Sequence, residues 1–156
     1  MYEPEGMFTT EVARGDEAPG TARLYEAARK AHAACMVCGE GAPIFGLRFA
    51  VDPAGGVQAT FRAAEHFQGY AGILHGGVIS TLLDAAMVHC LFARGVTAVT
   101  AEMTVRFLRE VPVDCDIRVG ATLVGERHGV FQMAASLSRA RTRLAVARGK
   151  FCRTAR

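Results

Sequence analysis

Asp84 is the residue whose surroundings most clearly suggest chemistry. It lies in the middle of VISTLLDAAMVHCLFA, residues 78–93, and is the only formally charged side chain between His75 and Arg94. An ionised carboxylate that is buried without partners loses several kcal/mol of solvation even after the protein relaxes. We therefore expect Asp84 either to be paired by a residue distant in sequence or to face a cavity in which its charge is used.

His75-Gly76-Gly77 directly precedes this apolar stretch and predicts the start of a long helix. The first turn of a helix offers unpaired N–H groups, which could hold a carbonyl oxygen that becomes an oxyanion during acyl transfer. Gly76 and Asp84 are eight residues apart, which is ~12 Å along a helix. One small carbonyl group cannot touch both, so the spacing predicts a site shared between two copies of the chain.

Two further residues of this helix, Ser80 and Met87, are candidates for the same site. Ser80 lies one turn before Asp84, but no G-x-S-x-G elbow is present, so we expect it to line the pocket or bond back to the helix rather than act as a nucleophile. Met87 is expected in the core or in an acyl pocket. His89 is expected to be a packed histidine.

The five cysteines include Cys35 and Cys38, which form a C-x-x-C-G sequence with Gly39. A structural zinc site would need two more ligands, and no second C-x-x-C or H-x-x-x-H follows. A redox-active pair is expected at the start of a helix that follows a strand, which is not the pattern here. We therefore expect no metal and free thiols in a reducing compartment.

Composition narrows the class of protein. The chain has 156 residues, 51% hydrophobic content and a net charge of +3 from scattered arginines. These numbers indicate one domain with a sizeable core, part of which could be buried between subunits, and no nucleic-acid partner. No apolar run approaches ~18 uncharged residues and no secretory signal is evident, so we expect a cytoplasmic protein without a membrane span. Residues 1–20 read as a loose leader to a single domain over 21–156.

The predicted elements give an α+β fold. An Ala-rich segment over 21–36 predicts an N-terminal helix, and two segments predict strands joined by a turn. Past the central helix, period-2 alternation predicts an antiparallel meander with one face covered by that helix. In the first of these later strands, Thr100, Glu102 and Arg106 fall on one face. The strand segments are 44–51, 56–63, 97–108, 114–124, 130–140 and 144–152.

These motifs together resemble the hotdog-fold thioesterases, and within them the PaaI-like acyl-CoA thioesterases. The match consists of His75-Gly76-Gly77 with an acid nine residues after the His, and of TAEMTVRFLREVP from Thr100 to Pro112. The C-x-x-C-G sequence and Gly46-Leu47 recur in one subgroup. The resemblance implies a hotdog fold: an antiparallel sheet of about six strands wrapped around one long central helix, with an N-terminal helix.

The resemblance also implies roles for residues. Asp84 would be the nucleophile or the general base that activates water, and the Gly76 N–H would polarise the thioester carbonyl. His75 would shape the turn, and Thr100 would position the water or the carboxylate. Many relatives have Asn at the position of Gly69, where Gln68 could take its place. The residues we assign to substrate binding are Gln68, Gly69, Gly77, Ser80, Met87, Arg106 and Arg109.

The function expected from this resemblance is hydrolysis of an acyl-CoA to a free acid and CoA by a homodimer or homotetramer. No metal or organic cofactor is expected, since CoA enters as part of the substrate. Two alternatives stay open: a non-catalytic module that binds an acyl-CoA or an aromatic ligand, and a 3-hydroxyacyl dehydratase, which His66-Phe67 faintly suggests. An aryl-acetyl, a benzoyl and a fatty acyl group would all suit an apolar pocket.

Overall fold

The computed structural model describes residues 20–41 and 44–154. Apart from Gly20, the leader expected over 1–20 lies outside the described residues, as does Ala42-Pro43. Two α-helices, a 3-10 turn and six strands follow one another. They are α1 (Thr21–Ala31), β1 (Ala50–Val51), β2 (Val57–Ala63), η1 (Glu65–Phe67), α2 (Gly76–Phe92), β3 (Ala98–Phe107), β4 (Cys115–Arg127), β5 (Val130–Arg139) and β6 (Thr142–Arg153).

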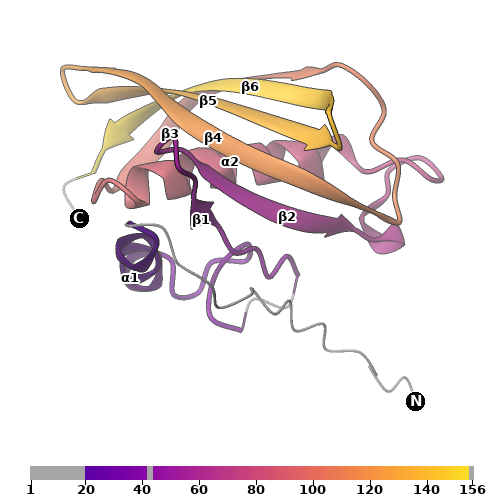
Figure 1. Ribbon diagram of the computed structural model, residues 1–156, viewed down its shortest axis with the longest axis horizontal. Helices are drawn as coiled ribbons and strands as arrows, with labels where there is room; N and C mark the ends of the chain where they lie inside the picture. The colour runs from indigo at the N-terminus through magenta and orange to yellow at the C-terminus, as the bar shows by residue number, and fades with distance from the viewer. Residues whose placement is uncertain (1–19, 42–43, 155–156) are drawn as a thin grey trace.

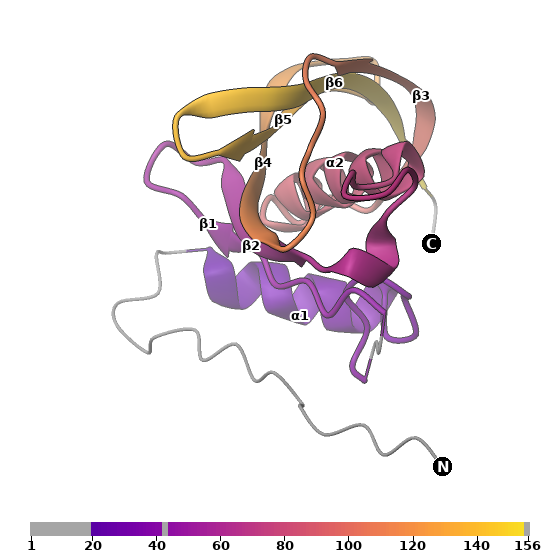
Figure 2. The same ribbon diagram turned by 90° about the vertical axis from the view of Figure 1, so that its right-hand side faces the viewer.

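The six strands form one antiparallel sheet in the order β1-β2-β4-β5-β6-β3. Figures 1 and 2 show the sheet curving around α2, with α1 on the side of α2 away from β5 and β6. The expected α+β class, the six strands and the central helix are confirmed. In the described part of the chain, no helix is long and apolar enough to cross a membrane.

Helix α2 is apolar on nearly every side because it is covered on nearly every side. Its second half is almost completely buried, against the sheet on one side and α1 on the other. The buried residues of α2 are Ile79, Leu82, Leu83, Ala85, Ala86, Met87, Val88, His89, Cys90, Leu91 and Phe92. The rigid core of the domain is therefore built around this helix.

Strand β3 pairs with β6 at the edge of the sheet and contains a bulge. Thr100 stands opposite the fully buried Phe151, whereas Glu102 stands opposite Lys150, with a register shift between them. An extra residue in one strand moves the following side chains to the other face. Thr100 therefore faces α2, while Glu102 is on the outer face, where its carboxylate is 3.0 Å from Lys150 Nζ. The expectation that Thr100, Glu102 and Arg106 share a face was wrong because the bulge interrupts the alternation.

The N-terminal elements are shorter than the sequence predicts. Helix α1 ends at Ala31 rather than at residue 36, since a series of turns begins at His32. The strand expected over 44–51 pairs only at Ala50–Val51. Its earlier part lacks a strand partner because the Leu47 N–H donates to Val37 O, in the turns after α1. The segment after α1 therefore acts as a packed connection.

Candidate active site

Asp84 and Thr100 form a direct hydrogen bond between α2 and β3. The Thr100 hydroxyl donates to Asp84 Oδ1 over 2.6 Å. Asp84 is half-buried and Thr100 is exposed, so the pair opens to solvent at the edge of the sheet. Of the two situations expected for Asp84, the structure shows a partner distant in sequence, together with access from outside. A carboxylate held in one orientation and open to water can accept a proton from a bound water molecule or attack a carbonyl carbon.

The amino end of α2 is capped by His75. Its Nδ1 accepts a hydrogen bond from the Gly77 N–H over 2.9 Å, with His75 itself in an extended conformation. Among the described residues, none accepts a hydrogen bond from the Gly76 N–H. That donor stands at the positive end of the helix dipole and is available to an oxygen atom of a ligand.

The two glycines of this motif have different constraints. A Cβ at Gly77 would lie 3.0 Å from His75 Nδ1, so any larger residue would require the capping ring to shift. A Cβ at Gly76 would make ordinary contact, 3.6 Å, with the ring of Phe107. Neither glycine has a positive φ, because both already belong to the helix, and the left-handed turn before the helix is made by Gly72.

Gln68 and Gly69 support the capping histidine from the preceding loop. The Gln68 side-chain oxygen accepts the Gly72 N–H over 3.0 Å and closes the loop. A Cβ at Gly69 would lie 3.2 Å from the His75 ring, so the glycine allows the loop to approach that ring. Both residues, assigned to substrate binding from the sequence, lie exposed beside the amino end of α2.

Three other residues of α2 that the sequence analysis considered are Ser80, Met87 and His89. The Ser80 hydroxyl donates to Gly76 O over 3.0 Å, one of the two placements expected for it. Met87 is fully buried, with its Sδ facing Gly149 of β6. His89 is packed as expected: its Nδ1 is 2.7 Å from Ala85 O, and its ring stacks on Phe49. Burial lowers the pKa of His89 to about 4, and the bond to Ala85 opposes this shift only in part.

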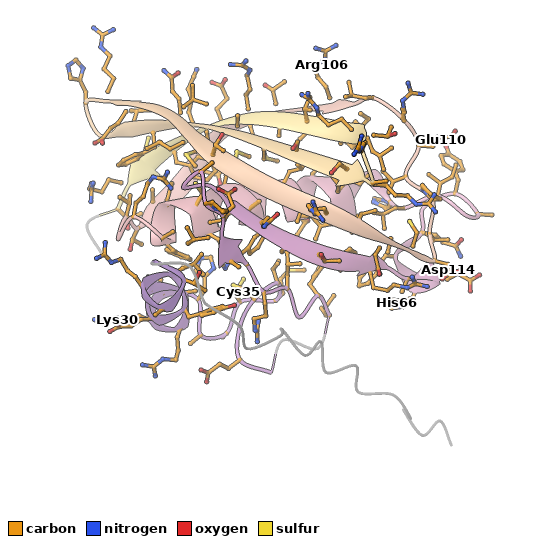
Figure 3. All side chains as sticks on the ribbon, in the orientation of Figure 1. Lys30, Cys35, His66, Arg106, Glu110 and Asp114 are labelled. Atoms are coloured by element: carbon orange, nitrogen blue, oxygen red, sulfur yellow. The ribbon has the colours of Figure 1, made fainter. Side chains whose placement is uncertain are left out.

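Arg106 and Arg109 are exposed and lie away from the Asp84–Thr100 pair. After the bulge, Arg106 lines a groove of about 880 Å³ on the outer face of the sheet. Figure 3 shows Arg106 projecting from the side of the molecule opposite α1. Arg109 follows the end of β3, where its N–H donates to Leu144 O. The structure therefore does not bring Arg106 to the carboxylate.

Two residues near the site were not expected from sequence reasoning. Phe107 lies against Gly76 and remains half-exposed, so it forms one wall at the amino end of α2. Its position in the strand motif after Thr100 was the available signal. His32 packs edge-on against His89 and Phe92 of α2 and lies within electrostatic range of Asp84: burial lowers the pKa of His32, and the charge of Asp84 opposes that shift.

Comparisons with known proteins find similarity to thioesterases. The Thioesterase superfamily model matches residues 71–145, a segment that contains α2, β3, β4 and β5. The bovine acyl-coenzyme A thioesterase THEM4 is 36% identical over 59 residues, which cover 38% of this chain and 23% of that protein. The chain thus matches less than a quarter of the length of this curated relative.

Two solved structures show the same fold. The Escherichia coli PaaI protein, from the phenylacetic acid degradation operon, superposes with a TM-score of 0.73 at 18% identity, over 86% of this chain and 95% of that one. A hypothetical thioesterase from Streptococcus pneumoniae TIGR4, solved with coenzyme A, superposes with a TM-score of 0.62 at 20% identity. The superposition covers 64% of this chain and 82% of that one. Residues 71–145 thus match the thioesterase superfamily, and the chain has the hotdog fold of these solved structures.

Proposed function

We propose that this protein hydrolyses an acyl-CoA thioester to a carboxylic acid and CoA. The observation that carries the proposal is the Asp84–Thr100 pair. In this pair, a solvent-accessible carboxylate on an otherwise uncharged helix is oriented by the Thr100 hydroxyl of β3. Structures of the S. pneumoniae thioesterase also exist with one Asp or one Thr replaced by Ala. Those two residues are 16 positions apart, the separation between Asp84 and Thr100.

In the proposed reaction, Asp84 removes a proton from a water molecule as the water oxygen attacks the thioester carbonyl carbon. The carbonyl oxygen becomes an oxyanion and accepts a hydrogen bond from the free N–H of Gly76. Collapse of the tetrahedral intermediate breaks the C–S bond, and the CoA thiolate leaves and takes up a proton. Direct attack by Asp84, followed by hydrolysis of the anhydride, uses the same residues. CoA takes part only as a portion of the substrate.

We propose further that two copies of the chain build each site. Gly76 and Asp84 are separated along α2 by ~12 Å, too far to act on one carbonyl group. Strand β3 is an edge strand, and the exposed apolar side chains Val99, Phe107 and Leu108 lie on or beside it. A long apolar edge is ready to pair with another chain. Such pairing would bring the Asp84–Thr100 pair of one copy toward the Gly76 N–H of its partner.

The test is release of free thiol from a panel of phenylacetyl-, benzoyl- and C4–C16 acyl-CoAs. We expect turnover of at least one member and a loss of ~10²-fold or more in Asp84→Asn. The matched control is Asp116→Asn, which changes an exposed carboxylate on β4 that pairs with Arg62. Saturable binding of one acyl-CoA without release from any of them would contradict hydrolysis and favour a ligand-binding module.

A further inference from the structure

Three potential metal ligands come together where α1 ends. The ligand atoms of His32, Cys35 and Cys38 all lie within 4.8 Å of one another, and each residue is half-buried. His32 Nδ1 is 3.6 Å from Cys38 Sγ. Around a tetrahedral zinc ion with bonds of about 2.3 Å to sulfur and about 2.0 Å to nitrogen, such atoms stand about 3.6 Å apart. The spacing therefore already matches two ligands of one ion.

The backbone between the cysteines is folded as a tight turn. The Val37 N–H points at Cys35 Sγ over 3.4 Å, and the Gly39 N–H donates to Cys35 O over 2.8 Å. A Cβ at Gly39 would lie 2.6 Å from Cys35 O, so only glycine fits after Cys38. The Val37 N–H is thus placed to donate to the Cys35 sulfur.

This turn is fixed to the rest of the domain. The Leu47 N–H donates to Val37 O over 2.9 Å, and Arg48 Nη1 donates to Cys38 O over 3.0 Å. His32 packs edge-on against Phe92 of α2. Because the ligands are anchored from both sides, a metal site here would need little rearrangement.

We propose that His32, Cys35 and Cys38 bind a zinc ion. Two thiolates and a neutral imidazole give a neutral complex with Zn²⁺, and sulfur with imidazole nitrogen is the ligand set that zinc prefers. Each thiol releases its proton to solvent as the metal binds. Water takes the fourth position, and a cavity of about 410 Å³ lined by His32 and Cys38 provides access. The ion holds the end of α1 to the segment that leads into β1.

The sequence pattern for this site is H-x-x-C-x-x-C rather than two separated pairs. This pattern was not predicted from the sequence, because the third ligand, His32, precedes the cysteines and caps the carboxyl end of α1. The proposed metal ligands do not include Asp84 or Thr100, and the test of this site does not require turnover of an acyl-CoA.

Cobalt is the first probe, since Co²⁺ occupies zinc sites and reports its ligands by absorption. The 156-residue chain, stripped of metal by a chelator under reducing conditions, is titrated with Co²⁺. We expect one equivalent to bind, with thiolate-to-cobalt charge-transfer bands and intense visible bands typical of tetrahedral coordination. Zn²⁺ should then displace the cobalt. Absence of the charge-transfer bands overturns the proposal for the native chain without recourse to any variant.

Variants then assign the ligands. Cys38→Ser and His32→Ala should each weaken Zn²⁺ binding by roughly tenfold or more in competition with a chromophoric chelator. Cys152→Ser, at a half-buried cysteine on β6, is the control and should bind as the native chain does. Equal binding by all variants, or a Cys35–Cys38 disulfide that persists in the presence of Zn²⁺ under mild reduction, would refute the site.

Discussion

Thr100 Oγ1 reaches Asp84 Oδ1 at 2.6 Å, although the two residues lie on different elements and 16 positions apart. The contact depends on two features of the fold: β3 returns to the edge of the sheet beside β6, and the bulge that follows Thr100 leaves this residue on the side of α2. A hydroxyl that donates to a carboxylate fixes one of its oxygens and leaves the other for a substrate or for water.

Removal of this hydroxyl should slow the reaction without unfolding the domain. Thr100→Val keeps the shape of the side chain but loses the donor, and a hydrogen bond to a charged group contributes about 1.5–3 kcal/mol. We expect kcat to fall by roughly 10- to 100-fold in the thiol-release assay, with a smaller change in KM. Thr100→Ser keeps the donor and should recover most of the rate. Equal rates for the Val and Ser variants would exclude this role for the hydroxyl.

Gly76→Pro tests the donor at the amino end of α2. Proline is well suited to the first position of a helix, and His75 already has the extended conformation that a following proline requires. The substitution therefore removes the N–H while it preserves the helix, and we expect a loss of ~10²- to 10³-fold in kcat. Circular dichroism should be unchanged.

A mixture of Gly76→Pro and Asp84→Asn chains tests whether the site is shared. If each site takes Gly76 from one chain and Asp84 from the other, every mixed dimer contains one intact site. Unfolding and refolding the two inactive variants together should then restore about a quarter of the native activity. No recovery, with mixed dimers present by mass spectrometry, would place both residues of a site in one chain.

The two glycines of the motif should respond differently to alanine. Gly77→Ala displaces the capping ring of His75, and loss of a helix cap costs about 1 kcal/mol of unfolding free energy. Gly76→Ala meets only ordinary contact with Phe107 and exchanges glycine for a better helix former, so stability should hold or rise by up to ~1 kcal/mol. Urea unfolding measures both. Equal destabilisation of the two variants would contradict the assigned contact.

His89 should make the domain sensitive to acid. The imidazole titrates near 6.5 when unfolded, whereas burial lowers its pKa to about 4 in the folded protein. The unfolded chain therefore binds more protons below about pH 6.5, and stability is lost as the pH falls toward 4. Between about pH 7 and pH 5 we expect a loss of about 2 kcal/mol from this group. His89→Phe should show a correspondingly shallower decline, and an unchanged slope would show that other groups are responsible.

The sequence was sufficient to predict the parts of the fold that depend on local pattern. The apolar run around Asp84 and the alternation in the later strands predict the central helix and the sheet, both of which the structure confirms. The bulge in β3 could not be predicted, because it follows from the pairing of β3 with β6 rather than from the types of its own residues. For that reason, the alternation in the sequence wrongly predicted that Arg106 and Thr100 share a face of the strand.

The region around the cysteines was harder to predict for a related reason. The Ala-rich segment favours helix through residue 36, but tertiary contacts of the turn after His32 outweigh this local preference. The proximity of His32 to Cys38 depends on that turn. Distances between side chains six residues apart cannot be read from the sequence when the backbone between them is irregular.

The near-complete burial of α2 also limits how this domain can diversify. The same helix carries the candidate carboxylate and the centre of the core, so most of its positions admit only substitutions that preserve volume. Under the proposed function, different acyl groups would be accommodated by residues outside it, such as those of the loop before His75 and of the exposed edge at Phe107 and Leu108. Relatives that differ in substrate should therefore differ at these margins while the helix keeps its composition.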